Sequence, residues 1–328
     1  MRKITQCFLL ALLTVLLIAC GNEESNGSVE GASAEENVVV SIANLGLSPL
    51  NVAKDAGFLE EELSKHNATF DYSVHQAGPP INEGIASKRV DFAALGEGAV
   101  LGGANNKLDT KLISLAADGK KGINTIIATK KSGVTKVEQL KGKKIAVGFG
   151  TSNHVFLLKV LDQAGLSADD VTLVNLSIAD GHPAFQTNQV DAWATVDLYA
   201  NVEAANGAVA LINAEQVNLF SPTFYVARGE FAEKNPEIVK AILTAINRAI
   251  QLKQTDEEKY FEIAANAASQ EVQAIKANET FEQLNEVPSD ELIQQLQESA
   301  EILKELKYVT SDIDVKSLVD TSYIEAIK

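Results

Sequence analysis

Short apolar segments alternate with helical patterns along the chain from Val38 onwards. Several segments are almost continuously apolar, such as VVVSIA, TIIA and KIAV, as expected of parallel strands that helices cover on both faces. The expected strands are residues 38–43, 70–75, 91–95, 111–116, 124–129, 144–147, 171–176, 191–195 and 223–227. Strands that alternate with helices predict an α/β fold with mostly parallel sheets.

Capping residues mark the starts of several helices. Ser48-Pro49 reads as an N-cap followed by a first-turn proline, and Asn235-Pro236 starts a long helix. Thr151-Ser152 begins another, with an apolar face formed by Val155, Leu158 and Leu161. Ser289 caps the last predicted helix, whose apolar side is Leu292, Leu296, Leu303 and Leu306. From about Phe231 the chain is predicted to be nearly all helical, and no internal repeat of fixed period is visible.

The first 19 residues have the pattern of a secretory signal peptide. Arg2 and Lys3 are positive, and residues 7–19 are almost wholly apolar. That apolar segment is too short to span a bilayer, which takes about 20 residues. Its ending, Leu-Ile-Ala-Cys, resembles the lipobox of bacterial lipoproteins, where cleavage precedes a cysteine that then carries lipid. The resemblance makes Cys20 the first mature residue and the lipid attachment site. The alternative is an ordinary secretory signal with an incidental cysteine.

Residues 20–37 are predicted to form a flexible tether. The sequence GNEESNGSVEGASAEEN after Cys20 consists of Gly, Ser, Asn, Ala and Glu with one valine, so it cannot bury enough apolar surface to fold. A coil of this length reaches roughly 20–25 Å. A lipid, a flexible segment and a folded domain describe a protein anchored at the outer face of a cell membrane.

Composition narrows the function further. Loss of the signal peptide would leave 309 of the 328 residues, enough for two domains. Cys7 and Cys20 are the only cysteines, so the mature chain is expected to have no disulfide and no thiolate metal site. The net charge of −16, or −18 without Arg2 and Lys3, argues against nucleic acid and anionic headgroups as partners. An anionic ligand would therefore have to be bound by local dipoles.

Gly- and Ser-rich turns follow many of the predicted strands and open helices. Examples are Asn44 to Pro49, Gln76 to Pro79, Gly96 to Gly98, Gly148 to His154 and Ser177 to Pro183. Ligands of α/β sheets bind beyond the carboxyl ends of the strands, and free N–H groups at a helix start attract anions. The turns therefore predict an anion pocket, although each alone is also typical of an ordinary tight turn.

Enzyme signatures are missing from the sequence. It has no nucleophile elbow, P-loop, dinucleotide-binding glycine motif or HExxH motif. The four histidines, His66, His75, His154 and His182, lack metal-ligand spacing on one element. Asp197 and Glu97 could act together as acid and base only if the fold joined them. We therefore predict no enzyme, no metal and no cofactor.

Several short motifs stand out along the chain: Ala77-Gly78-Pro79, Gly84, VDFAALG at 90–96, LKGKKIAV at 140–147, GTSNH at 150–154 and LLKVL at 157–161. Together they resemble the substrate-binding proteins of ABC importers for aliphatic sulfonates and taurine. QVDAWA at 189–194 with Asp197 is closest to the sulfonate branch, whereas FAEKNPEIVK at 231–240 is more like the taurine branch. The resemblance runs from about Val38 to the C-terminal helices, and its pattern is shared with binders of nitrate and thiamine precursors.

The resemblance implies a two-lobe periplasmic-binding-protein-like (type II) fold with two mostly parallel sheets and hinge crossovers. Residues 38–125 plus 223–328 would form lobe 1, and residues 126–222 would form lobe 2. The segments TIIATKK and TFYVARG would be the crossovers. The cleft between the lobes would close on the ligand.

The resemblance also implies the cleft residues Ser48, Gly78, Gly96, Glu97, Thr151, Ser152, His154, Trp193 and Asp197. Glu97 is longer than the aspartate that the sulfonate branch carries, and Leu198 and Tyr199 replace its proline and tryptophan. Trp193 is equally a candidate half-buried sheet residue, His154 a surface residue, and Asp197 a loop cap. A carboxylate at Asp197 would suit the ammonium group of taurine.

The function implied is capture of a small anionic or zwitterionic ligand, an aliphatic sulfonate or taurine, by a monomeric receptor. An ABC permease, and through it an ATPase, would be its partners, with membrane attachment by lipid alone. The alternatives are a nitrate or thiamine- or riboflavin-precursor binder and, in another class, a cell-surface enzyme.

Overall fold

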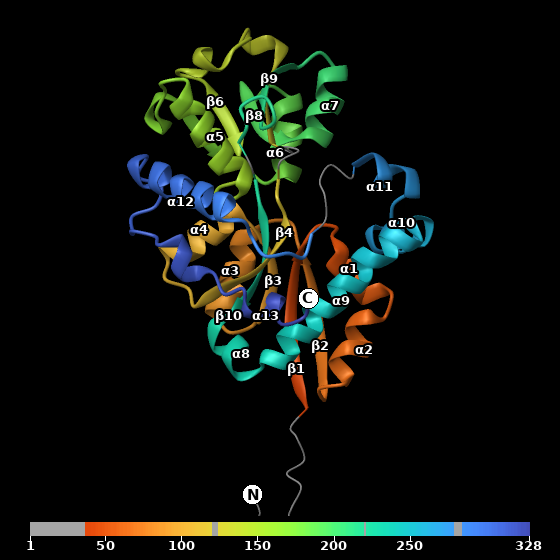
Figure 1. Ribbon diagram of the computed structural model, residues 1–328. Coiled ribbons are helices and arrows are strands. Elements are labelled where there is room, and N and C mark those ends of the chain that lie inside the picture. Colours follow the sequence, from red (N-terminus) through yellow and green to blue (C-terminus); the bar gives the residue numbers. More distant parts are fainter. Residues whose placement is uncertain (1–36, 120–123, 220, 279–283) are drawn as a thin grey trace, which may run out of the picture. The chain divides into compact units, whose positions relative to one another are not determined.

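The computed structural model describes residues 37–119, 124–219, 221–278 and 284–328 (Figure 1). The predicted signal peptide, Cys20 and the tether up to residue 36 lie outside the described residues. Residues 36–328 form one compact unit by their internal contacts. Within the described ranges, no helix is both long enough and apolar enough to cross a membrane.

The first sheet combines strands from both ends of the sequence. Strand β10 is antiparallel to its neighbours β3 and β4, while β1 is parallel to β2 and β3. Four strands therefore share one direction. The order across the sheet is β2 (Ala68–His75), β1 (Val38–Leu45), β3 (Phe92–Gly96), β10 (Thr223–Arg228) and β4 (Thr110–Ala117).

The second sheet repeats this arrangement with the middle of the chain. Strand β5 is antiparallel to β8 and β9, while β6 is parallel to β7 and β8. The order is β7 (Thr172–Asn175), β6 (Lys144–Val147), β8 (Ala192–Val196), β5 (Asn124–Ala128) and β9 (Val209–Asn213). The α/β prediction is confirmed, with two mixed sheets that each contain one reversed strand. The prediction missed β9, an edge strand with no fully buried residue.

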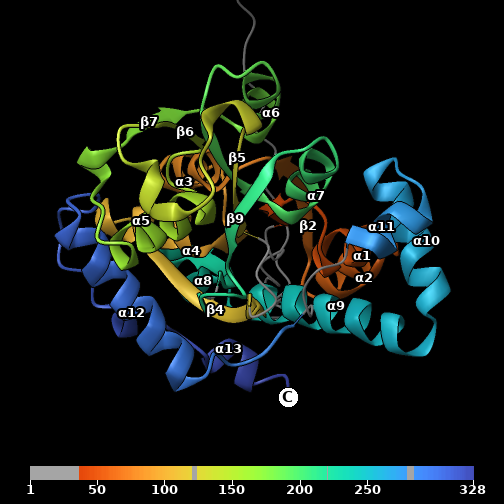
Figure 2. The same ribbon diagram turned by 90° about the horizontal axis from the view of Figure 1, so that it is seen from above.

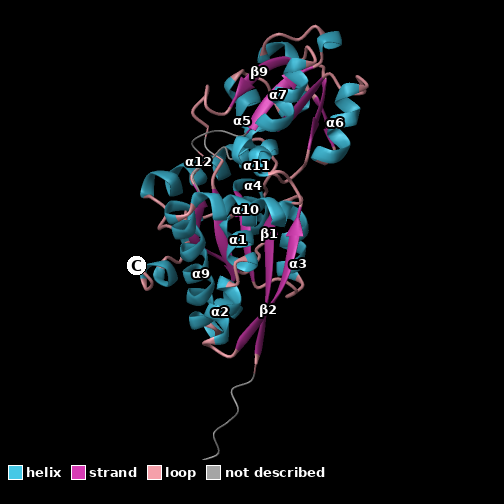
Figure 3. Ribbon diagram, turned by 90° about the vertical axis from the view of Figure 1, so that its right-hand side faces the viewer, coloured by secondary structure: helices cyan, strands magenta, loops and turns pink. Residues whose placement is uncertain are grey.

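Helices cover both faces of the first sheet. Residues of α1 (Pro49–Asp55), α2 (Phe58–Ser64), α9 (Pro236–Thr255) and α10 (Glu257–Ala268) share one core cluster with one face. Residues of α3 (Gly78–Ala86), α4 (Glu97–Asn105) and α12 (Asp290–Glu305) share a second cluster with the other face. Figure 3 shows α1, α2 and α9 beside one face of β1 and β2 and α3 beside the other.

The second sheet is covered by α5 (Ser152–Gln163), α6 (Ile178–Gln186) and α7 (Asp197–Ala205). The remaining helices are α8 (Gly229–Lys234), α11 (Val272–Asn278) and α13 (Ser322–Glu325), with short 3-10 turns at Lys130–Ser132, Val137–Leu140, Ala168–Asp170 and Val315–Leu318. The predicted caps Ser48, Thr151 and Ser289 each accept a backbone N–H at a helix start. The helix that Ser289 caps is followed by the short α13, so it is not the last.

The chain passes between the sheets twice, once between β4 and β5 and once between β9 and β10. Strand β5 pairs within the second sheet and β10 within the first. The lobe boundaries at 125/126 and 222/223, implied by the resemblance, stay a prediction. We use lobe 1 and lobe 2 for the parts of the chain around the first and second sheets.

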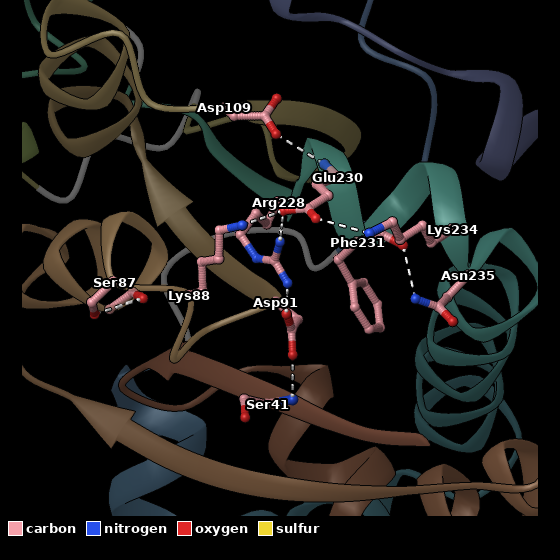
Figure 4. Close-up of polar contacts among 11 residues, drawn as sticks. Ser41, Ser87, Lys88, Asp91, Asp109, Arg228, Glu230, Phe231, Lys234 and Asn235 are labelled. Atoms are coloured by element: carbon pink, nitrogen blue, oxygen red, sulfur yellow. Dashed lines mark hydrogen bonds and ion pairs between the residues drawn. The ribbon is translucent and has the colours of Figure 1, made fainter. Parts of the chain in front are cut away.

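Asp91, in the VDFAALG segment, is the centre of a polar network at the start of β3. Asp91 precedes β3, and its carboxylate accepts the Ser41 N–H of β1 at 3.0 Å and pairs with Arg228 at 2.6 Å (Figure 4). Glu230 continues this network to Lys88 and Lys234, whose hydrogen bonds hold the Glu230 pKa at about 2. The network joins strands from both ends of the chain. It lies at the amino-terminal end of β3, whereas helix α4 begins at the carboxyl end of that strand.

Candidate functional site

Helix starts gather beyond the carboxyl ends of the parallel strands in both sheets. In the first sheet α3 follows β2 and α4 follows β3, while in the second α5 follows β6 and α7 follows β8. Each helix start offers N–H groups that have no partner within the helix. This topology is the reason that predicted site residues from distant parts of the sequence can approach one another.

The starts of α4 and α5 touch one another. A Cβ built on Gly96 would lie 2.6 Å from the Ser152 hydroxyl, and one on Gly98 would lie 2.5 Å from the Thr151 carbonyl oxygen. A Cβ on Gly150 would lie 3.0 Å from Pro79. The approaches at Gly96 and Gly98 require glycine, because a Cβ there would overlap the Ser152 hydroxyl or the Thr151 backbone. Figures 1 and 2 both place α5 beside α4 and α12.

Five predicted residues therefore lie together: Gly78, Gly96, Glu97, Thr151 and Ser152. Gly78 starts α3, where a Cβ would overlap Ala99 of α4, so α3 packs closely on α4. Gly98 and Gly150 belong to the same contact, yet the predicted set omits both. Both glycines lie in the glycine-rich turns from which the site was predicted, so the sequence could have indicated them.

The candidate hydroxyl groups differ in availability. Ser48 donates to Asn44 Oδ1 at 3.2 Å and accepts the Leu50 N–H at 3.2 Å. Thr151 donates to the Gly148 carbonyl at 2.6 Å and accepts the His154 N–H at 3.4 Å. Both hydroxyls thus serve as helix caps whose protons are already donated.

Ser152 is the candidate with a free hydroxyl. Its side chain and the backbone N–H groups of Ser152 and Asn153 have no hydrogen-bond acceptor among the described residues. Asn153 donates its side-chain amide to the Thr195 carbonyl at 2.7 Å, which fixes the start of α5 to the end of β8. Three donors at one helix start suit an anion.

His154 supports this helix start from inside. It is 2% exposed, stacks on Phe149 with ring centroids 4.7 Å apart, and meets the edge of Tyr308 at 4.6 Å. Burial lowers the His154 pKa to about 4, so the ring is neutral at pH 7. Its Nδ1 accepts the Gly150 N–H at 3.3 Å, which leaves the proton on Nε2. The predicted surface alternative for His154 is excluded.

The Glu97 carboxylate is buried and already has a partner within the protein. It pairs with Lys159 of α5 at 3.0 Å, and the two residues are 2% and 8% exposed. Lys159 lies seven residues after Ser152, which places both on one side of α5. Sequence reasoning did not single out Lys159, although it lies in the LLKVL motif at 157–161, and it missed Tyr308, which lies in none of the motifs.

Trp193 and Asp197 lie in the second sheet and at the start of α7. Trp193 is 1% exposed and packs against the rings of His182, Phe185 and Tyr199. Asp197 is half-buried, and its carboxylate accepts a hydrogen bond from the Thr125 hydroxyl.

Ser48 lies apart from these residues, in a polar group with Asn44 and Asn51. Phe149 and Leu198 expose apolar surface, at 38% and 45%.

Two cavities border α12. One of about 260 Å³ is lined by Glu97, Lys159, Pro222 and residues of α12. A larger one of about 890 Å³ lies between α12 and residues 311–325 and contains none of the predicted site residues. In the part of the chain that the structure describes, no three His, Cys, Asp or Glu side chains gather in a way that could hold a metal ion.

Comparison with known proteins places the chain in a family. The family model described as NMT1/THI5 like matches residues 47–258. A protein of Bacillus subtilis (strain 168) named as an aliphatic sulfonates-binding protein is 34% identical over 96% of this chain and 94% of its own. The taurine-binding periplasmic protein of Escherichia coli (strain K12) is 33% identical over 59% of each chain.

Solved structures agree with the fold. The alkanesulfonate-binding protein SsuA from Xanthomonas axonopodis pv. citri, bound to MOPS, superposes with a TM-score of 0.74 at 25% identity over 88% of this chain and 99% of its own. The two-lobe periplasmic-binding-protein type II fold is thereby confirmed. The desulfurization enzyme DszB, in complex with biphenyl-2-sulfinic acid, shares the fold alone, with a TM-score of 0.65 at 14% identity over 89% and 99% of the two chains. The chain therefore belongs to the NMT1/THI5-like family, in the group of ABC-transporter substrate-binding proteins that includes the sulfonate- and taurine-binding proteins.

Proposed function

We propose that this protein is the ligand-capturing receptor of an ABC import system and that its ligand is an aliphatic sulfonate, taurine included. The observation that carries the proposal is the start of α5, where the Ser152 hydroxyl and two backbone N–H groups are free to donate. The named ligands of the B. subtilis and E. coli relatives support the same class.

A sulfonate suits these donors for physical reasons. It is ionised at all ordinary pH and presents three oxygens that only accept hydrogen bonds. Charge-assisted bonds from N–H and O–H groups are the stronger kind. The helix dipole adds local positive potential to a chain of net charge −16. Neutral His154 keeps the turn in place without adding a charge of its own.

The rest of the ligand would also meet lobe 2. We propose that the half-buried Asp197 carboxylate accepts the ammonium group of taurine and that the exposed parts of Phe149 and Leu198 contact an alkyl tail. The contact set Ser48, Gly78, Gly96, Glu97, Thr151, Ser152, His154, Trp193 and Asp197 stays a prediction. Within it, Thr151 and Ser48 act as caps in this structure, and Trp193 lies in the core.

The proposal includes an extracytoplasmic location. We propose that the signal peptide is removed, that Cys20 is lipidated, and that the monomeric protein delivers its ligand to a membrane permease with its ATPase beneath. Cys20→Ser should release the protein from the membrane fraction or block processing of the signal. Unchanged fractionation together with an unchanged mass of the mature protein would rule out the lipid anchor.

Calorimetry with taurine, ethanesulfonate, nitrate and a neutral thiamine precursor tests the function. We expect both sulfonates to bind and mass spectrometry to recover them unchanged, as a transport receptor requires. Binding of the neutral compound alone would favour the thiamine-precursor alternative. Conversion of a sulfonate or sulfinate would favour an enzyme that shares the DszB fold.

A further inference from the structure

One buried ion pair joins the two lobes. Glu97 is the first residue of α4 in lobe 1, and Lys159 lies on α5 in lobe 2, with 3.0 Å between Oε1 and Nζ. The Glu97 N–H also donates to the Pro222 carbonyl at 3.0 Å, in the segment that returns to the first sheet. Glu97 thus contacts both the second lobe and its connection to the first.

The face of α5 that carries Lys159 is the face that meets lobe 1. Val155 and Leu158 of α5 belong to the same core cluster as Val100 of α4 and Leu296 of α12. Two turns before Lys159, Ser152 lies against Gly96. Apolar contacts on this face can slide, whereas the buried Glu97–Lys159 pair fixes one position of α5 on α4.

We propose that Glu97 is a positioning residue: its pair with Lys159 holds α5 so that the donors at Ser152 face the ligand, and Glu97 itself does not touch the ligand. The inference rests on the proposed function. It departs from the ligand contact that the family resemblance implies for this position. The carboxylate is 2% exposed and already bound to an ammonium group of the protein.

The chemistry of two ligands separates these roles. Taurine carries an ammonium group and ethanesulfonate does not. A ligand-contacting Glu97 would act on taurine alone, whereas a positioning Glu97 acts on the sulfonate head that both share. Removal of one partner of a buried pair leaves an uncompensated charge, while removal of both is often neutral.

The test measures the affinity of both ligands by calorimetry. We expect Glu97→Gln and Lys159→Met each to weaken taurine and ethanesulfonate by the same factor, at least about tenfold, and the double variant to return to within about threefold of the parent. The matched control is Glu237→Gln, because the Glu237–Lys240 pair at 2.8 Å lies on an exposed part of α9. It should change neither affinity.

Hydrogen exchange of the full chain without ligand gives a second measurement that does not depend on sulfonate binding. Amides of residues 156–160 in α5 should exchange at least about tenfold faster in Glu97→Gln and at the parental rate in the double variant. If the parent binds no sulfonate, the proposed function fails, while exchange still tests the positioning role. Loss of taurine binding alone, or a double variant as impaired as the worse single variant, would overturn the inference.

Discussion

Strands β3 and β8 occupy the same place in the two sheets, and each follows an aspartate. The Asp91 carboxylate accepts the Ser41 N–H at 3.0 Å, and the Asp191 carboxylate accepts the Lys144 N–H at 2.9 Å. Asp91 also pairs with Arg228 at 2.6 Å. In the second sheet, Thr129 stands where Arg228 stands in the first, since each donates its N–H to the carbonyl of the aspartate. The aspartate therefore faces an arginine side chain at this position in lobe 1 and a threonine in lobe 2.

Six residues further on, the two lobes diverge again. Glu97 and Asp197 are each the first residue of the helix that follows the central strand. Glu97 is buried in an ion pair with Lys159, whereas Asp197 is half-buried and accepts a hydrogen bond from the Thr125 hydroxyl. The next residues are Gly98, which lies against Thr151, and Leu198, which is 45% exposed. The two helix starts occupy equivalent positions in the topology but differ in their surroundings. The start of α4 contacts lobe 2, whereas the start of α7 is partly exposed to solvent.

The largest expected effect concerns the charged aspartate. Asp91→Ala removes the buried carboxylate that pairs with the Arg228 guanidinium, 13% exposed, and leaves it with Glu230 at 3.1 Å; the free energy of unfolding should fall by up to about 3–5 kcal/mol. Asp191→Ala removes a hydrogen bond to a backbone N–H and should cost only about 1–3 kcal/mol. Denaturant unfolding of both variants measures the difference. Equal losses would show that the Arg228 pair adds nothing to lobe 1.

The turns after β1 and β6 offer a second comparison. Asn51 accepts the Ser48 N–H at 2.9 Å, and His154, at the same helix position, accepts the Gly150 N–H at 3.3 Å. The two side chains differ because the His154 imidazole can take up a proton at acidic pH, whereas the Asn51 amide cannot. Its pKa falls from the ordinary 6.5 to about 4 through burial.

This depressed His154 pKa predicts a pH dependence. Above pH 6.5 the ring is neutral in both the folded and unfolded states, so the shift has no effect there. As pH falls from 6.5 to about 4, the unfolded chain takes up a proton that the folded protein does not, and about 3 kcal/mol of stability is lost. His154→Asn should remove this part of the decline in unfolding experiments at several pH values. Parallel curves for parent and variant would contradict it.

The contact between the helix starts can be tested at Gly98. In Gly98→Ala the new Cβ would lie 2.5 Å from the Thr151 carbonyl oxygen, so α4 and α5 must separate. Overpacking of this kind costs about 1–3 kcal/mol, and sulfonate affinity should fall about 5- to 150-fold. Gly102→Ala on the same helix meets no atom within 4 Å and is the control. Equal affinities of the two variants would show that this contact is not needed for binding.

The smallest expected effects separate the adjacent hydroxyls at α5. Ser152→Ala should weaken a sulfonate by about 1–3 kcal/mol with little change in stability, because its hydroxyl has no hydrogen-bond partner among the residues that the structure describes. Thr151→Ala should instead lower stability by about 0.5–2 kcal/mol through loss of the cap. Calorimetry and thermal unfolding of both variants give the comparison, and the opposite assignment of effects would refute it.

Local signals in the sequence predicted most of the fold. Apolar runs located every strand except β9, whose edge position leaves no fully buried residue to mark it. Caps located the starts of α1, α5 and α12. The second sheet's repeat of the first was not visible as a fixed period, because the match lies in strand order and in single residues such as Asp91 and Asp191.

The site was less predictable, because its contacts join distant segments. Lys159 lies in the LLKVL motif and Tyr308 in a stretch without a motif, and only the folded chain brings them to Glu97 and His154. Pattern alone could not distinguish a free hydroxyl at Ser152 from a donated one at Thr151. Trp193 was expected equally in the ligand wall and in the sheet, and its neighbours are the rings of the core.

A crystal structure of the protein with ethanesulfonate tests the central claim most directly. Our account predicts that the sulfonate oxygens lie within about 3 Å of the Ser152 hydroxyl and of the N–H groups of Ser152 and Asn153, with no arginine in contact. The Glu97–Lys159 pair should remain intact beside them. A sulfonate bound by a basic side chain elsewhere, such as Lys304 or Lys316 in the cavity along α12, would contradict it.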